Sequence, residues 1–102
     1  MSNTHIEIAP ISMATVANTP MLFEFTVRGT KFEIINNTDS GIYASPVSGA
    51  TVAESIFIPA QSEFIYDFGR NRAGRSYGYT DTIQIIPEEN NPIGVTVICL
   101  EH

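Results

Sequence analysis

The sequence is notable first for what it lacks. It contains no tryptophan, one cysteine, one lysine and two leucines among 102 residues. The single cysteine, Cys99, excludes an intrachain disulfide framework. Leucine and lysine favour helices, so their scarcity argues against an extensive helical structure. No stretch approaches the roughly 18 apolar residues of a membrane-spanning helix. We therefore expect neither a helical bundle nor a membrane protein.

Basic residues are also few. The formal net charge is −6, with five Lys and Arg against eleven Asp and Glu. An acidic surface repels nucleic-acid phosphates and anionic membranes, so we expect no generic binding to either. Hydrophobic residues make up 43% of the chain and aromatic residues 10%, which is typical of a globular protein. The length corresponds to a single domain over residues 1–102.

The two ends of the chain carry little information. The beginning, Met1 to His5, lacks a basic segment followed by an apolar one, so it does not resemble a signal peptide. The ending Leu100-Glu101-His102 resembles the start of an expression tag, and His102 is therefore set aside as a site candidate. We interpret residues 1–20 as an arm or edge segment, because Pro10 bars a long central strand there.

The residues that are abundant are those of β-structure, namely Ile, Val, Thr, Phe and Tyr. Short alternating runs recur about every ten residues and are separated by turn residues. They predict strands over residues 5–8, 23–28, 31–35, 42–45, 54–58, 63–68, 82–86 and 95–100. This pattern predicts an all-β fold: a single antiparallel β-sandwich or small barrel of about seven to eight short strands, Ig-like or jelly-roll-like.

One pair of these runs predicts a β-hairpin. The alternating segment 23–28 is followed by Gly29-Thr30, a two-residue connection that suits a type II′ turn. Pairing Arg28 with Lys31 would place Phe25 opposite Ile34 on one face. Together with the other strands, this register predicts the following core: Phe23, Phe25, Val27, Phe32, Ile34, Phe64, Tyr66, Phe68, Ile85, Val95 and Val97.

A search for catalytic chemistry finds no motif. His5 and Cys99 stand at opposite ends of the chain, so neither a metal centre nor a catalytic triad is indicated. Asp39 lies in a polar turn without the spacing of a calcium loop, and a solvated turn is the better interpretation. Cys99 lies in an apolar run and is interpreted as a small buried hydrophobe, with a reactive or intermolecularly paired thiol as the alternative. We expect no enzyme activity, no metal and no cofactor.

One segment has an unusual composition. Three of the five basic residues fall between residues 70 and 79, interleaved with two tyrosines. Arg and Tyr are enriched at binding hot spots, so this loop is the candidate interaction surface. The alternative is an exposed loop whose arginines pair with the protein's own acids. The candidate residues are Arg70, Arg72, Arg75, Tyr77 and Tyr79.

From residue 29 to residue 101 the order of motifs resembles a class of small phage and prophage virion proteins. The motifs are Asn36-Asn37-Thr38 at the end of a strand, the Ile42-Tyr43 pair, the turn Pro59-Ala60-Gln61-Ser62, and the terminal run 94–98. Gln61 stands where glycine is usual, and the Arg/Tyr loop is longer than expected. The resemblance implies a β-sandwich that serves as a structural or accessory component of a virion and is oligomeric.

From this resemblance we expect a non-catalytic module that assembles with copies of itself and with other virion proteins. It would be located in the virion after assembly in the bacterial cytoplasm. The alternative is a carbohydrate-binding or adhesion module that uses the loop Arg70–Tyr79. The absence of tryptophan, the residue that glycan platforms favour, weakens this alternative.

Overall fold

The protein consists of eight β-strands and one short 3₁₀ helix in the part of the chain that the structure describes. The structure is a computed structural model, and it describes residues 8–67 and 80–102. The strands are β1 (Ile11–Thr15), β2 (Met21–Gly29), β3 (Lys31–Asn36), β4 (Ile42–Ser45), β5 (Ile56–Ile58), β6 (Glu63–Asp67), β7 (Thr80–Pro87) and β8 (Asn91–Glu101). The 3₁₀ helix η1 covers Val52–Glu54.

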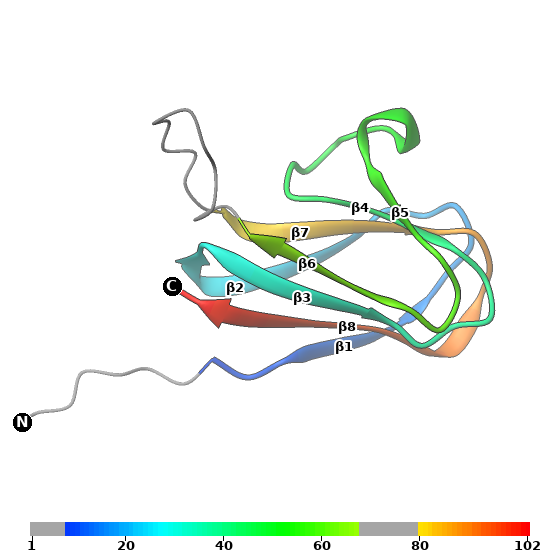
Figure 1. Cartoon of the computed structure of the whole chain (residues 1–102). Coiled ribbons are helices and arrows are strands. Elements are labelled where there is room, and N and C mark those ends of the chain that lie inside the picture. Colours follow the sequence, from blue (N-terminus) through cyan, green and yellow to red (C-terminus); the bar gives the residue numbers. More distant parts are fainter. Residues whose placement is uncertain (1–7, 68–79) are drawn as a thin grey trace, which may run out of the picture.

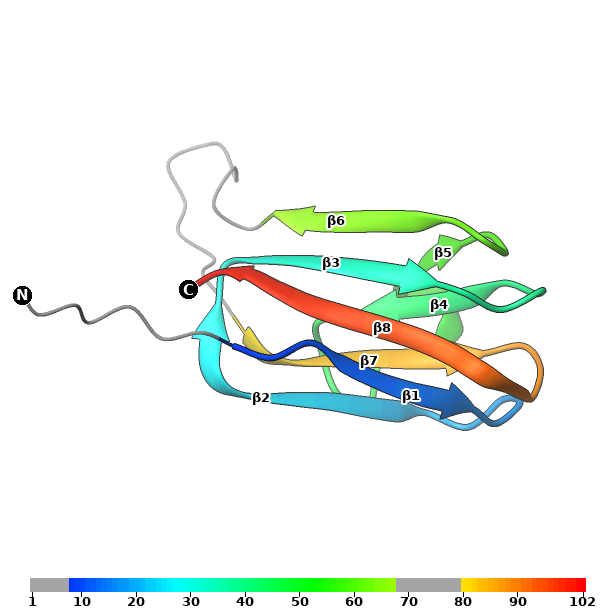
Figure 2. The same cartoon turned by 90° about the horizontal axis from the view of Figure 1, so that it is seen from below.

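The strands form two four-stranded antiparallel sheets that pack face to face (Figures 1 and 2). Sheet I has the strand order β1-β8-β3-β6, and sheet II has the order β2-β7-β4-β5. The predicted all-β sandwich is confirmed, and the two sheets do not close into a barrel.

The strand order is that of an eight-stranded jelly roll. The first half of the chain pairs with the second half in nested fashion: β1 with β8, β2 with β7, β3 with β6, and β4 with β5. This long ribbon folds over so that β3 also pairs with β8 and β4 also pairs with β7. Of the topologies that the sequence left open, the jelly roll is therefore the one adopted.

The predicted hairpin at Gly29-Thr30 is wrong. β2 pairs with β7 in sheet II, whereas β3 pairs with β6 and β8 in sheet I. The chain therefore crosses from one sheet to the other at this point, and the backbone N–H of Thr30 donates to the carbonyl of Glu101 at 2.8 Å. Phe25 and Phe32 face each other across the interior, with ring centroids 5.4 Å apart. Phe25 and Phe32 would face apolar neighbours in a hairpin as well as in a crossing between the sheets. The alternation of apolar and polar residues therefore cannot distinguish the two connections.

The predicted core is largely confirmed. Phe23, Phe25, Phe32, Ile34, Ile85, Val95 and Val97 are buried. Val27, Phe64 and Tyr66 are only partly buried against this cluster, and Phe68 lies outside the described residues. The prediction missed four members of the buried cluster, Ile42, Ala44, Ile58 and Ile83, whereas Cys99, expected separately to be buried, also belongs to it.

The N-terminal segment forms an edge strand at a different position from the one expected. The strand in this region is β1 (Ile11–Thr15), at the edge of sheet I, and it begins directly after Pro10. The predicted strand over residues 5–8 falls mostly outside the described residues, and Ile8 is not in a strand. Similarly, the predicted strand over 54–58 is shorter than expected, because η1 occupies its beginning.

The loop between β4 and β5 folds onto the outer surface of sheet II (Figure 1). Gln84 of β7 points outward from the sheet, yet it is 2% exposed. Its amide nitrogen donates to the carbonyl of Ala50 at 2.9 Å, and its amide oxygen accepts from the N–H of Gly49 at 2.7 Å. The loop therefore covers one part of this outer surface and leaves the rest to solvent.

Candidate functional site

The residues that the sequence singled out as an interaction surface, Arg70, Arg72, Arg75, Tyr77 and Tyr79, lie outside the described residues. The structure places the segment that contains them between β6 and β7. Their role therefore stays a prediction. The described residues offer three other surface features: a polar groove, the outer face of sheet I, and a row of apolar side chains on sheet II.

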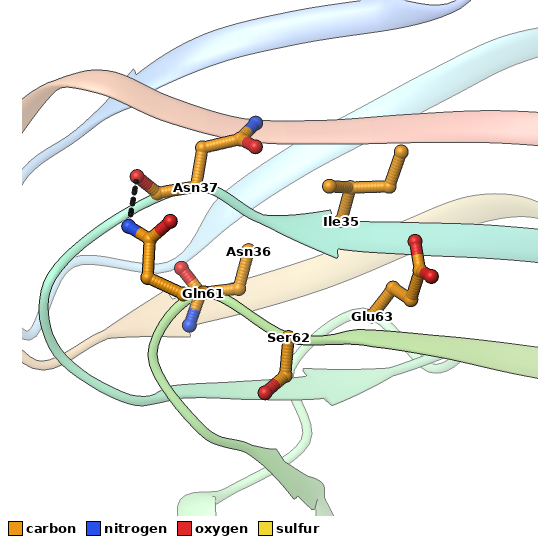
Figure 3. Close-up of a pocket in the computed structure, with 6 residues that line it drawn as sticks. All are labelled: Ile35, Asn36, Asn37, Gln61, Ser62 and Glu63. Atoms are coloured by element: carbon orange, nitrogen blue, oxygen red, sulfur yellow. Dashed lines mark hydrogen bonds between the residues drawn. The ribbon is translucent and has the colours of Figure 1, made fainter.

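The polar groove lies where β3 ends beside the turn that leads into β6 (Figure 3). It encloses about 420 Å³ and is lined by Ile35, Asn36, Asn37, Gln61, Ser62 and Glu63. Amide and carboxylate groups dominate this lining, so the groove can exchange hydrogen bonds with a polar ligand. The lining contains no histidine or cysteine, and it therefore lacks the usual base for nucleophilic catalysis.

Asn36 holds this end of the sandwich together. Its side chain is 1% exposed, and its amide nitrogen donates to the carbonyls of Ser40, Ile58 and Pro59 at 2.9–3.2 Å. Its amide oxygen accepts from the backbone N–H and the hydroxyl of Thr38, at 2.9 and 2.7 Å. The Asn-Asn-Thr motif that carried the family resemblance is therefore a structural junction of three chain segments.

Gln61, which stands where the resemblance leads one to expect glycine, has a backbone φ of +57°. This left-handed conformation is one that glycine adopts more readily than glutamine does. The side chain offsets part of the cost, because its amide nitrogen donates to the carbonyls of Asn37 and Thr38, each at 3.0 Å (Figure 3). Gln61 therefore maintains the turn and connects it by hydrogen bonds to residues 37 and 38 beside the groove.

The outer face of sheet I combines aliphatic and acidic side chains. Ile35, Ile65, Ile98 and Leu100 project from three adjacent strands, and no described element lies over them (Figure 2). Glu33 and Glu63 lie among them on β3 and β6 and share a side-chain hydrogen bond. Desolvation raises the pKa of Glu33 above its usual value, and the hydrogen bond and negative charge of Glu63 raise it further.

The third feature is a row of apolar side chains across the outer face of sheet II. Phe57 of β5 pairs with Tyr43 of β4, which in turn pairs with Ile86 of β7. The rings of Tyr43 and Phe57 have centroids 5.2 Å apart and planes tilted by 52°. Phe57 is 49% exposed although it has no polar group. We call Phe57, Tyr43 and Ile86 the aromatic row.

The alternation of residues in β4 and β5 is a sequence signal for the aromatic row. Ile56 and Ile58 both point into the core, so the alternation of a strand forces Phe57 to point outward. The same argument applies to Tyr43, which stands between buried Ile42 and Ala44. Strand alternation therefore predicts these exposed rings, provided that both faces of each strand are considered.

Cys99 is confirmed as a buried residue, 8% exposed. Burial raises the pKa of its thiol, which opposes formation of the reactive thiolate, although a hydrogen bond with the backbone of Glu101 lowers this pKa in part. Within residues 8–67 and 80–102, no three potential metal-ligating side chains come together. In the same residues, no helix has the length and apolar character needed to cross a bilayer.

Comparison of the chain with protein-family models, with curated proteins and with solved structures finds no match. The surfaces described above must therefore be interpreted from their own chemistry.

Proposed function

We propose that this chain is a non-catalytic structural or accessory module of a phage or prophage particle. In this proposal it acts by protein–protein assembly, with copies of itself and with other virion proteins, and its location is the virion after assembly in the bacterial cytoplasm. The eight-stranded jelly roll supports this proposal, because viral capsid domains use the same topology. Lectin domains use it too, so the fold alone does not assign a function.

The observation that carries the proposal is the outer face of sheet I. Its aliphatic side chains lie on three adjacent strands, and both Ile65 and Leu100 are more than 40% exposed. Exposed aliphatic side chains gathered on one face and interspersed with charged ones, such as Glu33 between Ile65 and Ile98, suit an interaction site on a soluble protein. Strand β6 is also the edge of this sheet, so its free backbone groups are accessible for pairing with another chain.

Particle association tests the proposed function directly. Phage particles induced from the source strain and purified on a density gradient should contain this chain in a fixed ratio to the major capsid protein, as measured by quantitative mass spectrometry. Its absence from particles, while it is present in the lysate, would refute a virion role.

The outer face of sheet I can be tested separately with polar substitutions. Replacing Ile65 and Ile98 with Ser should abolish association with particles and any self-association seen by sedimentation. A matched control is Val47→Ser, because Val47 is 61% exposed but lies in the β4–β5 loop. Equal loss of association in both variants would show that this face is not the interface.

The alternative function, a carbohydrate-binding or adhesion module that uses Arg70 to Tyr79, stays a prediction. Its residues lie outside the described part of the chain. Changing Arg70, Arg72 and Arg75 to Ser tests whether this loop is an interaction surface for assembly: a folded variant with undiminished particle association would make the loop ordinary surface and assign the interface elsewhere.

A further inference from the structure

The aromatic row lies on the part of sheet II that the β4–β5 loop leaves open. The neighbouring row of outward side chains, which contains Ser45 and Gln84, is buried beneath that loop. Phe57, Tyr43 and Ile86 therefore form a ledge across three strands next to the covered region. The two rings of this ledge are tilted by 52° to each other, and Phe57 is the exposed one of the two.

The rings of the row are held in place before any ligand arrives. Phe57 lies over Gly41, where even a single added methyl group would overlap its ring. Tyr43 is fixed by Glu88: its hydroxyl donates to Oε2 at 3.3 Å, while the N–H of Gly41 donates to Oε1 at 3.1 Å. A surface ordered in advance loses little conformational entropy on binding.

A hydrogen-bond acceptor, the Glu88 carboxylate, lies beside the aromatic row. Each oxygen of the Glu88 carboxylate accepts one hydrogen bond from the protein and retains acceptor capacity for a second one. Glu88 is solvent-exposed, so the remaining capacity is accessible. Burial of Tyr43 together with the charge and hydrogen bond of Glu88 raises the pKa of the phenol, so its hydroxyl stays protonated at neutral pH.

We propose that the aromatic row with Glu88 is a carbohydrate-binding surface that takes a pyranose ring with equatorial hydroxyls. Such a ring presents a flat face of C–H groups, which stacks on the exposed ring of Phe57, and a rim of hydroxyl donors, one of which reaches Glu88. Both groups lie next to Gly41, so the site offers an aromatic ring for the C–H face and, beside it, a carboxylate with remaining acceptor capacity for a hydroxyl. This inference does not depend on the proposed role in assembly, because it concerns the opposite sheet.

Saturation-transfer NMR of the full chain tests the proposal with two probes, methyl β-D-glucopyranoside and cellotetraose, at millimolar concentration. The ring protons H1, H3 and H5 should receive saturation and shift upfield, because they lie over an aromatic face. Sorbitol, which has comparable hydroxyls but no ring face, should receive none. Absence of transfer to both sugars would overturn the proposal.

Variants locate the binding on the row. Phe57→Ala should weaken binding of cellotetraose by about tenfold, the value of one good aromatic contact. Gly41→Ala should weaken it similarly by displacing a ring that is still present. The matched control is Ile65→Ala on the other sheet, because Ile65 is 48% exposed in a strand at a sheet edge, as Phe57 is.

Thermal melts should show that all three variants remain folded, since Phe57 and Ile65 are exposed and Gly41 does not have a positive φ. Unchanged binding in Phe57→Ala, or an equal loss in Ile65→Ala, would overturn the proposal. Should Gly41→Ala fail to fold, Phe57→Leu replaces it: this variant keeps apolar bulk without a ring and should lose the upfield shifts. If both sugars fail to bind and Phe57→Ala instead abolishes particle association, the row is a protein interface and the proposal is wrong.

Discussion

Single side chains determine how the ends of the strands are joined. Asn36 alone supplies five hydrogen bonds to the β3–β4 loop and the segment after β5. A buried amide that is fully satisfied fixes one arrangement of these loops, because any other arrangement would leave its groups unpaired. Asn36 therefore specifies the local structure, although a polar residue beside a turn could be taken for a binding-site residue from the sequence alone.

The contribution of Asn36 can be measured against that of its neighbour. Asn36→Ala should lower the free energy of unfolding by about 3 kcal/mol, because it removes the side-chain partner of the buried Ile58 carbonyl and of the Thr38 backbone N–H. Asn37→Ala is the control, since Asn37 is only partly buried and lines the open groove, and it should change stability by less than about 0.5 kcal/mol. Urea denaturation measures both values, and equal effects would contradict a specific role for Asn36.

At the scale of elements, the pairing of β1 with β8 depends on a bulge. Gly94 has a φ of +76°, and a Cβ at this position would overlap the backbone of Met13 and Ala14. The register of the pair shifts between Met13 and Thr15, where residues 92–94 of β8 lie opposite Ala14 alone, so β8 carries two extra residues there. The glycine therefore lets β1 approach the central strand of sheet I closely.

Alanine substitutions at two glycines distinguish the energetic cost of a positive φ from the cost of a steric clash. Gly49→Ala should cost about 1 kcal/mol, because Gly49 has a φ of +89° with open space around it. Gly94→Ala should cost about 3 kcal/mol, since it combines the same conformational cost with a clash against β1. Hydrogen exchange should show faster exchange in β1 for Gly94→Ala only. Equal losses of stability would mean that the approach of β1 is not tight.

Glu33 on β3 and Glu63 on β6 make the stability of the folded protein depend on pH. The raised pKa of Glu33 means that the folded protein holds this proton more tightly than the unfolded chain does. The associated stability is fully present below the ordinary Glu value of 4.5 and is lost as pH rises through the higher pKa of the folded state. The other charged groups on this face are Lys31, Asp67 and Glu101; half-buried Lys31 forms ion pairs with half-buried Asp67 and with exposed Glu101.

We therefore predict that Glu33→Gln raises stability at pH 7 by about 0.5 kcal/mol, the scale of one exposed cross-strand pair. It should also flatten the pH dependence of the melting temperature above pH 4.5. Glu24→Gln on β2 serves as the control, because Glu24 is exposed on the other sheet. A variant that is less stable than the parent at pH 7 would contradict the proposed repulsion.

The strands and most of the core could be predicted from the sequence, because alternation and turn residues are local signals. Phe23, Phe32 and Ile34 were placed in the core for this reason. The partner of each strand could not be predicted, since the choice between a hairpin and a crossing at Gly29 depends on β7 and β8, more than fifty residues further on. The burial of Gln84 was equally inaccessible, because it depends on a loop folding over the sheet.

At the scale of the whole molecule, the jelly roll joins residues that are far apart in the sequence. The outermost pair, Ile11 and Val97, is separated by 86 residues, the difference of the two numbers. Sheet I cannot form without β8, which lies between β1 and β3. Consequently, a deletion of residues 1–16 would remove β1 itself and make β8 an edge strand of sheet I.

This topology predicts slow folding. Loops must close before distant strands can pair, so refolding should take milliseconds to seconds. Stopped-flow fluorescence of the tyrosines, after a jump from urea to buffer, measures the rate. Refolding within microseconds would contradict a rate limited by the nested pairing of the two halves.

The position of β1 beside β8 has a mechanical consequence. The strands are antiparallel, so the beginning of β1 and the end of β8 lie at the same end of the sandwich (Figure 1). A force that pulls these ends apart acts across the backbone hydrogen bonds and breaks them one pair at a time, starting near Ile11 and Val97. Strands loaded along their length would instead break all bonds together. If a particle held this domain by the beginning of β1 and the end of β8, a low force would therefore separate the two strands. If the particle held the domain through a sheet face, the strands would stay paired.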